Sequence, residues 1–572
     1  MVCGRGRDGA ATDSVAYRAR SALVQETHRL PQEAALTLEI HVAPLSGSAL
    51  VRDHLRGGPA LAEFYSGPPL RIDSYRRKVE EIDRRFDATR RRALASVVRA
   101  STPGAAARLE EIVSGNGLFV TTGQQPGLFT GPLYTIHKIL CAVRLARELE
   151  DALGRPVAPL FWVASDDHDW EEANHLHVVD RRNELRRITL ASAPDAAPVS
   201  MRRRLLGPGI EEVFREFVES LPTTEFAGGL LELLREAYTP ERTVAESFTE
   251  VILRLTAPFD LLVVDGGDPR LKALALPQFE RELLEAAEHE SLLAAQTRAL
   301  EQAGYRSQVP VIPGATNLFY EDDAGRERIF RSDGGFELHG SGRRFERREL
   351  LALLRDEPAR FSANVVLRPI VESAVFPTAA YVGGPGEVSY FAQYGSLFRA
   401  HGIGAPVVFP RASVLLIEAK VRKVLDEFGL APADLRTPFH ELSTRLVRSS
   451  MPSAVEQALE SIRCNIETGY QELEVAAAAI DPTLSGPIEG GRNVSLARLA
   501  DVEKQIVRHL KRRQELELSK LAKAGANLYP AGNPQERVLN IFQYLVRYGQ
   551  ELLPAIAGAM RVSIDRTPGD PG

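Results

Sequence analysis

A polar cluster follows directly after an apolar run in "LFWVASDDHD", residues 160–169. It contains Ser165, Asp166, Asp167 and His168. Histidine titrates near neutral pH, and a neighbouring carboxylate can orient its ring. We therefore expect Asp167 and His168 to bind or deprotonate an amine or a hydroxyl group, with Ser165 and Asp166 beside the substrate.

Two other interpretations of this cluster remain open. More candidate ligands follow at Glu171, Glu172, His175 and His177, as in some metal sites. Zinc sites, however, usually have two histidines four residues apart on a helix, or closely spaced cysteines. The gap of seven residues between His168 and His175 fits neither pattern, so we expect no metal ligands here. The other alternative is an ordinary helix cap surrounded by solvated charges.

The stretch "TTGQQPGLFTGPLYTIHK", residues 121–138, is rich in glycine and proline and leads into helical apolar spacing. Pro132 suits the first position of a helix. Free backbone N–H groups and the positive end of the helix dipole favour a phosphate or a carboxylate at such a place. A tight turn without a ligand is the alternative, and neither a Walker loop nor a dinucleotide-binding glycine pattern is present. The candidate binding residues are Thr122, Gly123, Gln124, Gln125, Gly131, His137 and Lys138.

Two further apolar runs, "AAYVGGPGE" and "PVVFPRAS", end in polar residues. These residues are Gly383, Gly384, Glu387, Arg411 and Ser413. Ligands of open parallel sheets bind beyond the carboxyl ends of the strands, so we expect these residues to line a pocket. Arg368 follows another apolar run and could pair with a substrate carboxylate or form an ordinary buried ion pair.

Five apolar runs predict the strands of one sheet. They are "LFVTTGQQ", "LFWVASDDHD", "LLVVDGGD", "AAYVGGPGE" and "PVVFPRAS". Near-continuous apolar strands are typical of a parallel sheet covered on both faces. Helical segments at 133–150 and 271–302 would supply crossovers. The predicted fold class is α/β, with a Rossmann-like doubly wound parallel sheet.

The spacing of these runs predicts the domain organisation. A core of residues 39–412 carries two insertions, at about 185–255 and 270–362, because the gaps there exceed one crossover. Residues 1–38 have no sustained period and are expected to be a weakly ordered extension. Residues 541–572 are expected to return to the core.

Residues 413–540 are predicted to form a helical coiled-coil arm. Their apolar residues recur in alternating steps of four and three, which is typical of a coiled coil. One stripe contains Val455, Leu459, Ile462, Ile466, Tyr470 and Leu473, and a second begins with Leu499, Val502, Ile506 and Leu510. Between them, "DPTLSGPIEGGR" permits a reversal. We expect two antiparallel helices, either as a self-contained hairpin or as a dimerisation arm.

Composition excludes several classes of protein. Lys plus Arg number 70 against 76 Asp plus Glu, a net charge of −6, which lacks the basic footprint of a nucleic-acid-binding protein. No apolar run approaches the roughly 20 residues that span a bilayer, and no signal-peptide pattern is evident. The 3 cysteines are too few for a disulfide framework. We expect a cytoplasmic protein.

Several motifs together resemble one known family. They are "TTGQQPGLFTGPLYTIHK", "FWVASDDHDWEEANH", "YVGGPGEVSYFAQ", "VVFPRASVLLIE" and, near the C-terminus, "LYPAGNPQERVLNIF". Their order and spacing resemble the bacillithiol biosynthesis cysteine-adding enzyme family (BshC) from about residue 39 to about residue 560. The resemblance implies a Rossmann-type ligase core with two connecting-peptide insertions and a coiled-coil domain through which subunits form a homodimer.

The resemblance also implies a reaction. A cysteine ligase of this kind would join the carboxyl group of cysteine to the amine of glucosaminyl malate by an amide bond, giving bacillithiol. ATP with Mg²⁺ is the implied energy donor, and the loop at 121–138 would stabilise the developing phosphate charge. Asp167 with His168 is the expected base. Arg411 and Lys138 are the expected partners of the malate carboxylates.

The core of that family is similar to class I nucleotidylyltransferases and tRNA synthetases, whose signature ends in His-x-Gly-His. His137 corresponds to the second histidine and is therefore a candidate catalytic residue, but Tyr134 replaces the first histidine and Ile136 replaces the glycine. Two alternative functions remain, because a fold does not determine its chemistry. One is another carboxylate–amine ligase or nucleotidylyltransferase, and the other is a non-catalytic coiled-coil interaction protein.

Overall fold

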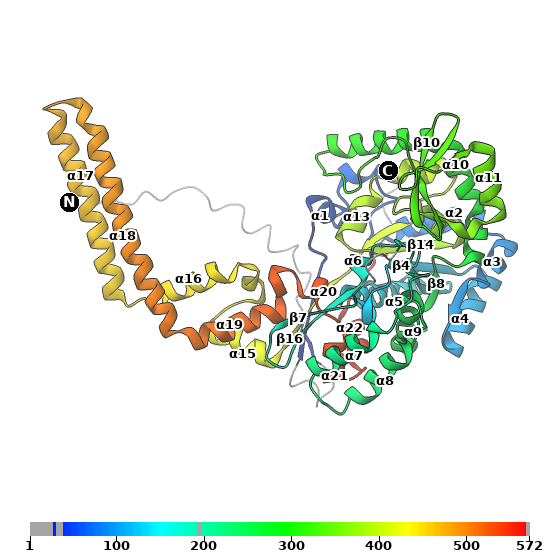
Figure 1. Cartoon of the computed structure of the whole chain (residues 1–572), viewed down its shortest axis with the longest axis horizontal. Coiled ribbons are helices and arrows are strands. Elements are labelled where there is room, and N and C mark those ends of the chain that lie inside the picture. Colours follow the sequence, from blue (N-terminus) through cyan, green and yellow to red (C-terminus); the bar gives the residue numbers. More distant parts are fainter. Residues whose placement is uncertain (1–26, 30–37, 192–196, 568–572) are drawn as a thin grey trace. The chain divides into compact units, whose positions relative to one another are not determined.

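The computed structural model describes residues 27–29, 38–191 and 197–567. These form two compact units (Figure 1). Unit 1 comprises the described residues up to Arg181, Arg186–Ile417 and those from Glu536 onward, and unit 2 comprises Arg182–Leu185 and Glu418–Gln535. Most of the expected weakly ordered extension lies outside the described residues. Its described part is β1 (Thr27–Arg29), which pairs antiparallel with β2 (Leu38–Ala43).

Both units contain many helices. Those of unit 1 are α1 (Ala49–Leu55), α2 (Ile72–Arg85), α3 (Ala88–Ala95), α4 (Pro103–Ser114), α5 (Tyr134–Leu153), α6 (Trp170–Ala173), α7 (Gly209–Ser220), α8 (Ala227–Ala237), α9 (Val244–Leu255), α10 (Pro269–Gln302), α11 (Arg347–Asp356), α12 (Arg368–Val375), α13 (Pro385–Phe391), α14 (Gly395–Ala400), α21 (Phe542–Tyr548) and α22 (Leu552–Ala559). Unit 2 contains α15 (Ala419–Glu427), α16 (Phe439–Ser449), α17 (Ser453–Ala478), α18 (Ser485–Arg513) and α19 (Glu515–Leu528), and α20 (Gln535–Val538) lies at the boundary. Across the described ranges, no helix is both long and apolar enough to cross a membrane.

A six-stranded sheet with the order β15–β14–β4–β5–β8–β3 forms the core of unit 1. Its strands are β3 (Val98–Ala100), β4 (Leu118–Gln124), β5 (Val157–Val163), β8 (Leu262–Asp265), β14 (Thr378–Gly383) and β15 (Val407–Pro410). Four parallel pairings join β15, β14, β4, β5 and β8, which confirms the five predicted strands. β3 was not predicted, because its three residues contain no apolar run, and it pairs antiparallel with β8.

The winding order of this sheet reverses beside β4. From β4 the chain proceeds to β5 and then β8 in one direction, and it returns to place β14 and β15 on the other side of β4. In doubly wound sheets the crevice for ligands lies at such a switch point, beyond the carboxyl ends of the strands. The fold therefore brings the predicted polar tails of β4 and β14 together.

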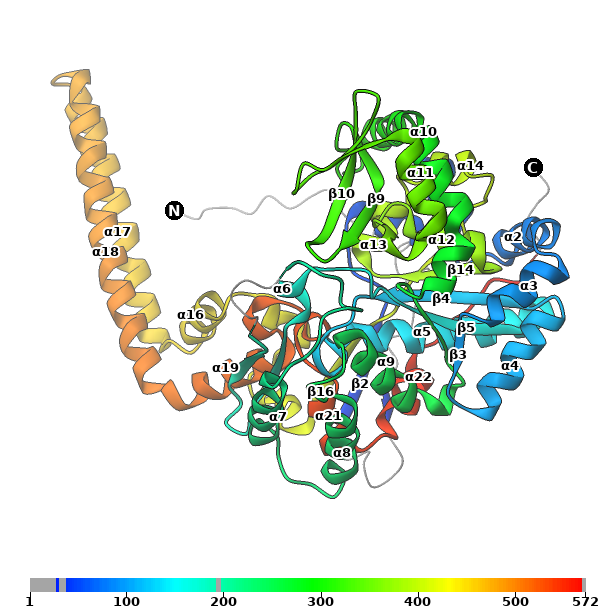
Figure 2. The same cartoon turned by 45° about the vertical axis from the view of Figure 1, so that its right-hand side comes forward.

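Both faces of the sheet are buried, as the predicted class requires. Side chains alternate between the faces. Phe119 and Val264 join a core cluster that also contains residues of α4, α10 and α12. On the opposite face, α5 packs against β4 and β5 (Figure 2). On this face the ring of Phe161 lies 6.1 Å from that of Phe248 in α9.

Two inserted segments occupy the gaps between the strands. Between β5 and β8 lie α6, the paired strands β6 (His175–Val179) and β7 (Leu185–Thr189), and α7 to α9. Between β8 and β14, α10 leads to a five-stranded antiparallel sheet with the order β12–β11–β10–β9–β13. Its strands are β9 (Ala315–Asp322), β10 (Gly325–Ser332), β11 (Gly335–Leu338), β12 (Arg344–Glu346) and β13 (Phe361–Ala363). Another small sheet joins β16 (Ser413–Glu418) to β2 and β1.

Unit 2 contains the predicted helical hairpin, formed by α17 and α18 (Figures 1 and 2). The Tyr470 hydroxyl of the predicted apolar stripe lies 3.0 Å from Ser495 Oγ on α18. The break between the helices is shorter than predicted, because α18 begins at Ser485 and includes Pro487 and several glycines. Pro487 lies in the first helical turn, where its missing N–H group costs no intrahelical hydrogen bond.

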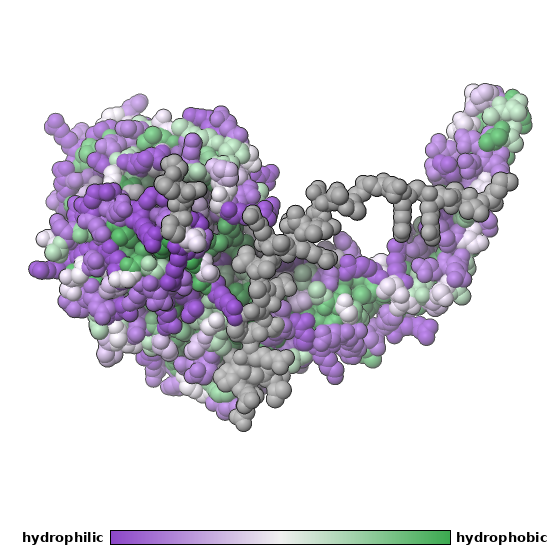
Figure 3. Space-filling view, turned by 180° about the vertical axis from the view of Figure 1, so that it is seen from behind, coloured by the Kyte–Doolittle hydropathy of each residue, from purple (hydrophilic) through white to green (hydrophobic). Residues whose placement is uncertain are grey.

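Several apolar side chains of the hairpin are exposed. Their exposed fractions are 47% for Ile462, 51% for Leu473, 62% for Val494, 50% for Val502 and 83% for Ile480. Figure 3 shows apolar surface near the turn between α17 and α18. Exposed apolar side chains along both helices of a hairpin are typical of a protein interface. We propose that a second copy of the chain covers it, which makes the hairpin a dimerisation arm.

Replacing Ile462 and Val502 together by glutamate should convert a dimer into folded monomers. Both side chains are exposed in the single chain, so the substitution spares the hairpin, but a glutamate in the dimer interface would have to be desolvated. Light scattering at micromolar concentration measures the mass, and circular dichroism measures the helix content. Leu459→Glu is the contrasting variant, because this half-buried residue should loosen the hairpin itself. A monomeric wild-type protein would contradict the proposal.

Candidate active site

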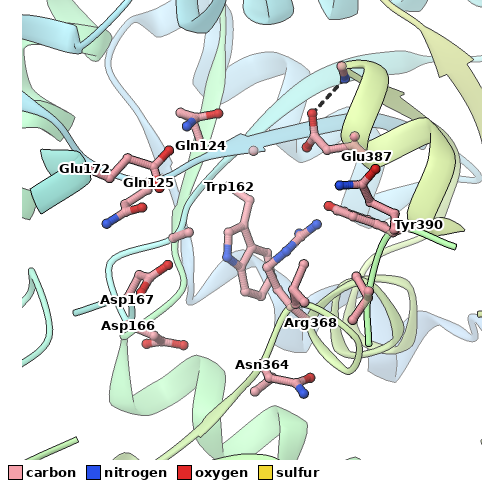
Figure 4. Close-up of a pocket in the computed structure, with 18 of the residues that line it drawn as sticks. Gln124, Gln125, Trp162, Asp166, Asp167, Glu172, Asn364, Arg368, Glu387 and Tyr390 are labelled. Atoms are coloured by element: carbon pink, nitrogen blue, oxygen red, sulfur yellow. Dashed lines mark hydrogen bonds between the residues drawn. The ribbon is translucent and has the colours of Figure 1, made fainter. Parts of the chain in front are cut away.

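A cavity of about 700 Å³ lies at the carboxyl ends of β4 and β14. Figure 4 shows Asp166 and Asp167 on one side, Glu387 on the other, and Trp162 and Arg368 between them. Ten predicted site residues line the cavity: Gly123, Gln124, Gln125, Lys138, Asp166, Asp167, His168, Gly384, Glu387 and Arg411. The other six, Thr122, Gly131, His137, Ser165, Gly383 and Ser413, do not line it. The fold thus brings together residues from four separate motifs, but not all predicted site residues reach the cavity.

The glycine-rich stretch after β4 divides into two parts with different partners. Gly123 lines the cavity, and a Cβ at this position would lie 3.0 Å from the Trp162 carbonyl oxygen on β5. Phe129 and Gly131, in contrast, have φ angles of 47° and 67°, and their carbonyl groups accept hydrogen bonds of 2.7 and 2.9 Å from the Asn540 amide. Much of the glycine and proline therefore shapes a loop that binds the C-terminal segment.

The expected anion site at the start of the following helix needs correction. α5 begins at Tyr134, two residues later than predicted. The Leu133 N–H donates to the Leu539 carbonyl group at 2.8 Å, and the Thr135 N–H donates to Pro132 at 3.0 Å. Because these N–H groups are bonded within the protein, an anion in the cavity must rely largely on side chains.

Lys138 and Glu387 form an ion pair at the switch point. Their charged atoms are 2.5 Å apart, and the ammonium group also donates to the Gly123 carbonyl group at 2.9 Å. Burial lowers the pKa of Lys138, although the Glu387 carboxylate opposes this shift. Burial alone would raise the pKa of Glu387, but Lys138 and the hydrogen bonds from Tyr381 and Gly384 hold it below its usual value. The charge of Lys138 is thus already matched by the protein.

Arg368 is held by a second buried carboxylate. Its guanidinium group donates to Glu372 at 2.8 Å and to the Tyr381 hydroxyl at 3.2 Å, which confirms the ion-pair interpretation. The same group also lines the cavity and lies 5.8 Å from the centre of the Trp162 ring. Arg368 therefore presents a fixed cation to the cavity.

Two arginines that sequence reasoning missed line the cavity from the inserted sheet. Arg326 and Arg328 are alternate residues of β10 and share one face of the strand. Their guanidinium carbons lie 3.8 and 5.0 Å from the centre of the Phe319 ring. Over the described part of the chain, neither forms an ion pair with a carboxylate. An alternating arginine pattern in "GRERIFR" was the available signal, but it is also common on solvent-facing strands.

Asp167 and His168 do not form the mutually oriented pair that we expected. Asp167 Oδ1 accepts hydrogen bonds from the backbone N–H groups of His168, at 2.7 Å, and Asp169, at 3.3 Å. His168 Nδ1 is 3.8 Å from Asp167 but 3.0 Å from the Arg326 guanidinium group, which can only donate. Burial and Arg326 lower the pKa of His168. The His168 ring is therefore neutral, and the lone pair on its Nδ1 already accepts the hydrogen bond from Arg326.

Asp166, which lines the cavity, and Ser165, which does not, belong to one charged network at the end of β5. Asp166 forms a 2.6 Å ion pair with Lys272, and burial raises the pKa of this carboxyl group against the opposing effect of Lys272. The Ser165 hydroxyl donates to Asp265, which also pairs with Arg202. These contacts hold the end of β5 beside the end of β8.

His137, Arg411 and Ser413 converge on Glu536, a residue outside every predicted site. Arg411 donates twice to its carboxylate, each time at 2.8 Å, and the Ser413 hydroxyl donates at 3.1 Å. His137 Nδ1 lies 3.3 Å from the same group. Burial lowers the pKa of His137, whereas the pKa of Glu536 is held far below its usual value by His137 and Arg411 despite burial. This geometry gives His137 a structural role, because its ring does not reach the cavity.

Glu536→Gln should lower the free energy of unfolding by about 3–5 kcal/mol, because it leaves the buried Arg411 guanidinium group without a counter-charge. Denaturant titration followed by circular dichroism measures this change. Glu551→Gln, at an exposed position in the same C-terminal segment, is the matched control.

The difference in the free energy of unfolding between Glu536→Gln and the wild type should depend on pH. The depressed pKa of Glu536 contributes stability above the unfolded value of about 4.3, and this contribution is lost as the pH falls toward the folded value. The difference in unfolding free energy between the two proteins should therefore decrease progressively as the pH falls below about 4. Parallel stability curves down to pH 3 would show that the carboxylate does not hold the segment.

Comparisons with known proteins agree with this architecture. A family model described as the N-terminal Rossmann-like domain of bacillithiol biosynthesis BshC matches residues 36–412, and one for the C-terminal coiled-coil domain matches residues 414–563. Similar proteins from several bacteria bear the name "Putative cysteine ligase BshC". That of Salinibacter ruber is 38% identical over 454 residues, covering 79% of this chain and 82% of the relative. That of Chlorobaculum tepidum is 34% identical over 467 residues, with the same coverage of 79% and 82%, and that of Geobacillus thermodenitrificans is 30% identical over 537 residues, covering 91% and 97%. The chain therefore belongs to the bacillithiol biosynthesis BshC family.

Proposed function

We propose that this chain is a cysteine ligase that joins the carboxyl group of cysteine to the amine of glucosaminyl malate. Membership of the BshC family supports a role in bacillithiol biosynthesis. The observation that carries the proposal is the switch-point cavity, where Arg326 and Arg328, which form no ion pair among the described residues, lie near the accessible carboxylate of Asp167. Such arginines suit an anionic substrate, and such a carboxylate suits an amine that must lose a proton.

Arg326 and Arg328 are the proposed partners of the malate carboxylates. Guanidinium groups bind carboxylates through two parallel hydrogen bonds, and such bonds are strong where water is excluded. The expected partners, Arg411 and Lys138, are less suitable because Glu536 and Glu387 already match their charges. Arg368, held by Glu372, would add positive potential without leaving its position.

ATP with Mg²⁺ is the proposed energy donor, since a carboxylate does not condense with an amine unaided. An oxygen of the cysteine carboxylate would attack a phosphorus atom of ATP, giving an acyl adenylate and pyrophosphate or an acyl phosphate and ADP. The amine would then form the C–N bond as AMP or phosphate leaves. The cavity volume of about 700 Å³ lies within the usual range for small-molecule sites. Gly123, Gln124, Gln125 and Lys138 line the part that would face the phosphates.

Asp167 is the proposed base for the amine proton. Over the described ranges, all hydrogen bonds to its carboxylate involve Oδ1, which leaves Oδ2 available to a substrate. His168 would act differently, because its Nδ1 accepts from Arg326. We therefore assign His168 to positioning the Arg326 guanidinium group and Asp167 to proton transfer.

Arg328→Gln should weaken the binding of glucosaminyl malate by about 1.5–3 kcal/mol, because a charged hydrogen bond is lost. This corresponds to roughly a 10- to 150-fold higher Kd by calorimetry. Arg328 is a better target than Arg326, whose buried side chain also bonds to Ser362. Arg347→Gln, at an exposed position, is the matched control. Wild-type affinity in a folded Arg328→Gln protein would remove this residue from the binding site.

Purified protein given cysteine, glucosaminyl malate, ATP and Mg²⁺ should form bacillithiol, detected by mass spectrometry. Asp167→Asn should slow the reaction by about 10²- to 10⁴-fold while cysteine still binds, because general base catalysis is lost. Asp169→Asn is the matched control, since Asp169 caps α6 and asparagine also serves as a cap. Equal rates for the two variants would show that Asp167 is not the general base and serves only to bind backbone N–H groups.

A gene deletion tests the assignment independently of the assay conditions. The deletion strain should lose bacillithiol and accumulate glucosaminyl malate. Normal bacillithiol in a strain without a second gene copy would refute the proposal. Product formation with a different amino acid, but not with cysteine, would identify another carboxylate–amine ligase on the same core.

A further inference from the structure

A second cluster of ionisable side chains lies in unit 1, outside the cavity. Glu282 and His289 lie on α10, and His401 directly follows α14, which packs against α10 (Figure 2). The exposed fractions of the three residues are 0%, 0% and 7%. One potential ligand atom from each lies within 4.8 Å of the others. None of these residues lines the switch-point cavity.

The two histidines carry buried ring nitrogens that lack hydrogen bonds. Among the residues that the structure describes, His289 Nε2 and both ring nitrogens of His401 have no hydrogen-bond partner. Their rings are 4.8 Å apart at an angle of 34°. Native proteins rarely leave buried polar atoms unpaired, and a bound ion or an ordered water usually accounts for the exceptions. Three such nitrogens in one place indicate a missing partner.

We propose that Glu282, His289 and His401 bind a divalent transition-metal ion, with Zn²⁺ as the preferred ion. Two imidazole nitrogens and one carboxylate oxygen are an established donor set for zinc. Mg²⁺ and Ca²⁺ prefer oxygen ligands, so two imidazoles disfavour them. Glu285 Oε2 lies 3.5 Å from His289 Nε2, at the other ring nitrogen from Glu282, and is not part of this donor set.

Hydrogen bonds from outside the cluster orient the Glu282 carboxylate. Its Oε1 accepts from the backbone N–H group of Asn317 at 2.8 Å and from the Asn317 side-chain amide at 3.1 Å. Metal-binding carboxylates are commonly oriented in this way. Glu282 Oε2 is 2.7 Å from His289 Nδ1, so a proton joins these groups when no ion is bound. Metal binding would release that proton to solvent.

The position of the cluster indicates a structural role for the ion. The backbone of α10 departs from helical geometry at Glu285, with φ −112° and ψ 15°, between the two ligands on that helix. An ion at this point would join both parts of α10 to the end of α14. Through Asn317 it would also stabilise β9, the neighbour of the strand that carries Arg326 and Arg328.

Metal analysis of the full-length chain tests the proposal directly. Protein purified without a metal-affinity tag should retain about one equivalent of zinc after dialysis, measured by plasma mass spectrometry. Protein stripped with a chelator should take up about one equivalent from ZnCl₂ and melt at a higher temperature after doing so. Co²⁺ in place of zinc should give visible absorption bands. Negligible metal in the purified protein, together with no uptake of Zn²⁺ or Co²⁺, would overturn the proposal.

A ring-preserving substitution shows whether the ion binds at this cluster. His401→Phe keeps an aromatic ring beside His289 but removes both nitrogen donors, and it should weaken zinc binding by more than about 100-fold. His509→Phe, at an exposed position, is the matched control. Full zinc binding by His401→Phe would place the ion elsewhere and overturn the assignment. If His401→Phe does not fold, the absorption spectrum of the Co²⁺-loaded wild type still distinguishes nitrogen ligation from adventitious binding.

Discussion

One buried carboxylate joins segments of unit 1 that are far apart in the sequence. Glu536 accepts hydrogen bonds from Arg411 and Ser413, and the His137 ring lies against it. These partners come from α5 and from the junction of β15 and β16. Removing such a charge from water costs several kcal/mol unless its hydrogen bonds are nearly complete. The ends of the strands, the helix after β4 and the C-terminal segment must therefore adopt their positions together.

The cavity contains two kinds of cation, which differ in whether a carboxylate of the protein already balances their charge. Lys138 and Arg368 are paired with buried carboxylates, so they shape the potential while remaining fixed. Arg326 and Arg328 have no such counter-charge among the described residues, and an anion that enters would supply one. The stacking of both guanidinium groups on Phe319 limits the entropy that binding must remove. Selectivity for an anionic substrate thus follows from the two arginine charges that no carboxylate among the described residues balances.

Sequence alone predicts the five parallel strands, because each is a near-continuous apolar run buried on both faces. It also predicts that residues such as Gly123 and Asp167 line the cavity, since the topology brings the carboxyl ends of the strands to one edge of the sheet. It misses Arg326, whose role depends on how an inserted sheet packs over that edge. It misjudges His137, because only the tertiary structure reveals that the ring faces Glu536 rather than the cavity.

The contacts of Asn540 impose an order of events on folding during synthesis. The left-handed backbone at Phe129 and Gly131 is sterically unfavourable for a non-glycine residue, and the Asn540 amide bonds to both carbonyl groups. The ribosome must first complete unit 2, which separates β16 from this segment. At roughly 5–20 residues per second, that delay is on the order of ten seconds. During this interval the loop after β4 lacks the two hydrogen bonds from Asn540, so the switch point of the nascent sheet is incomplete until the C-terminal segment is made.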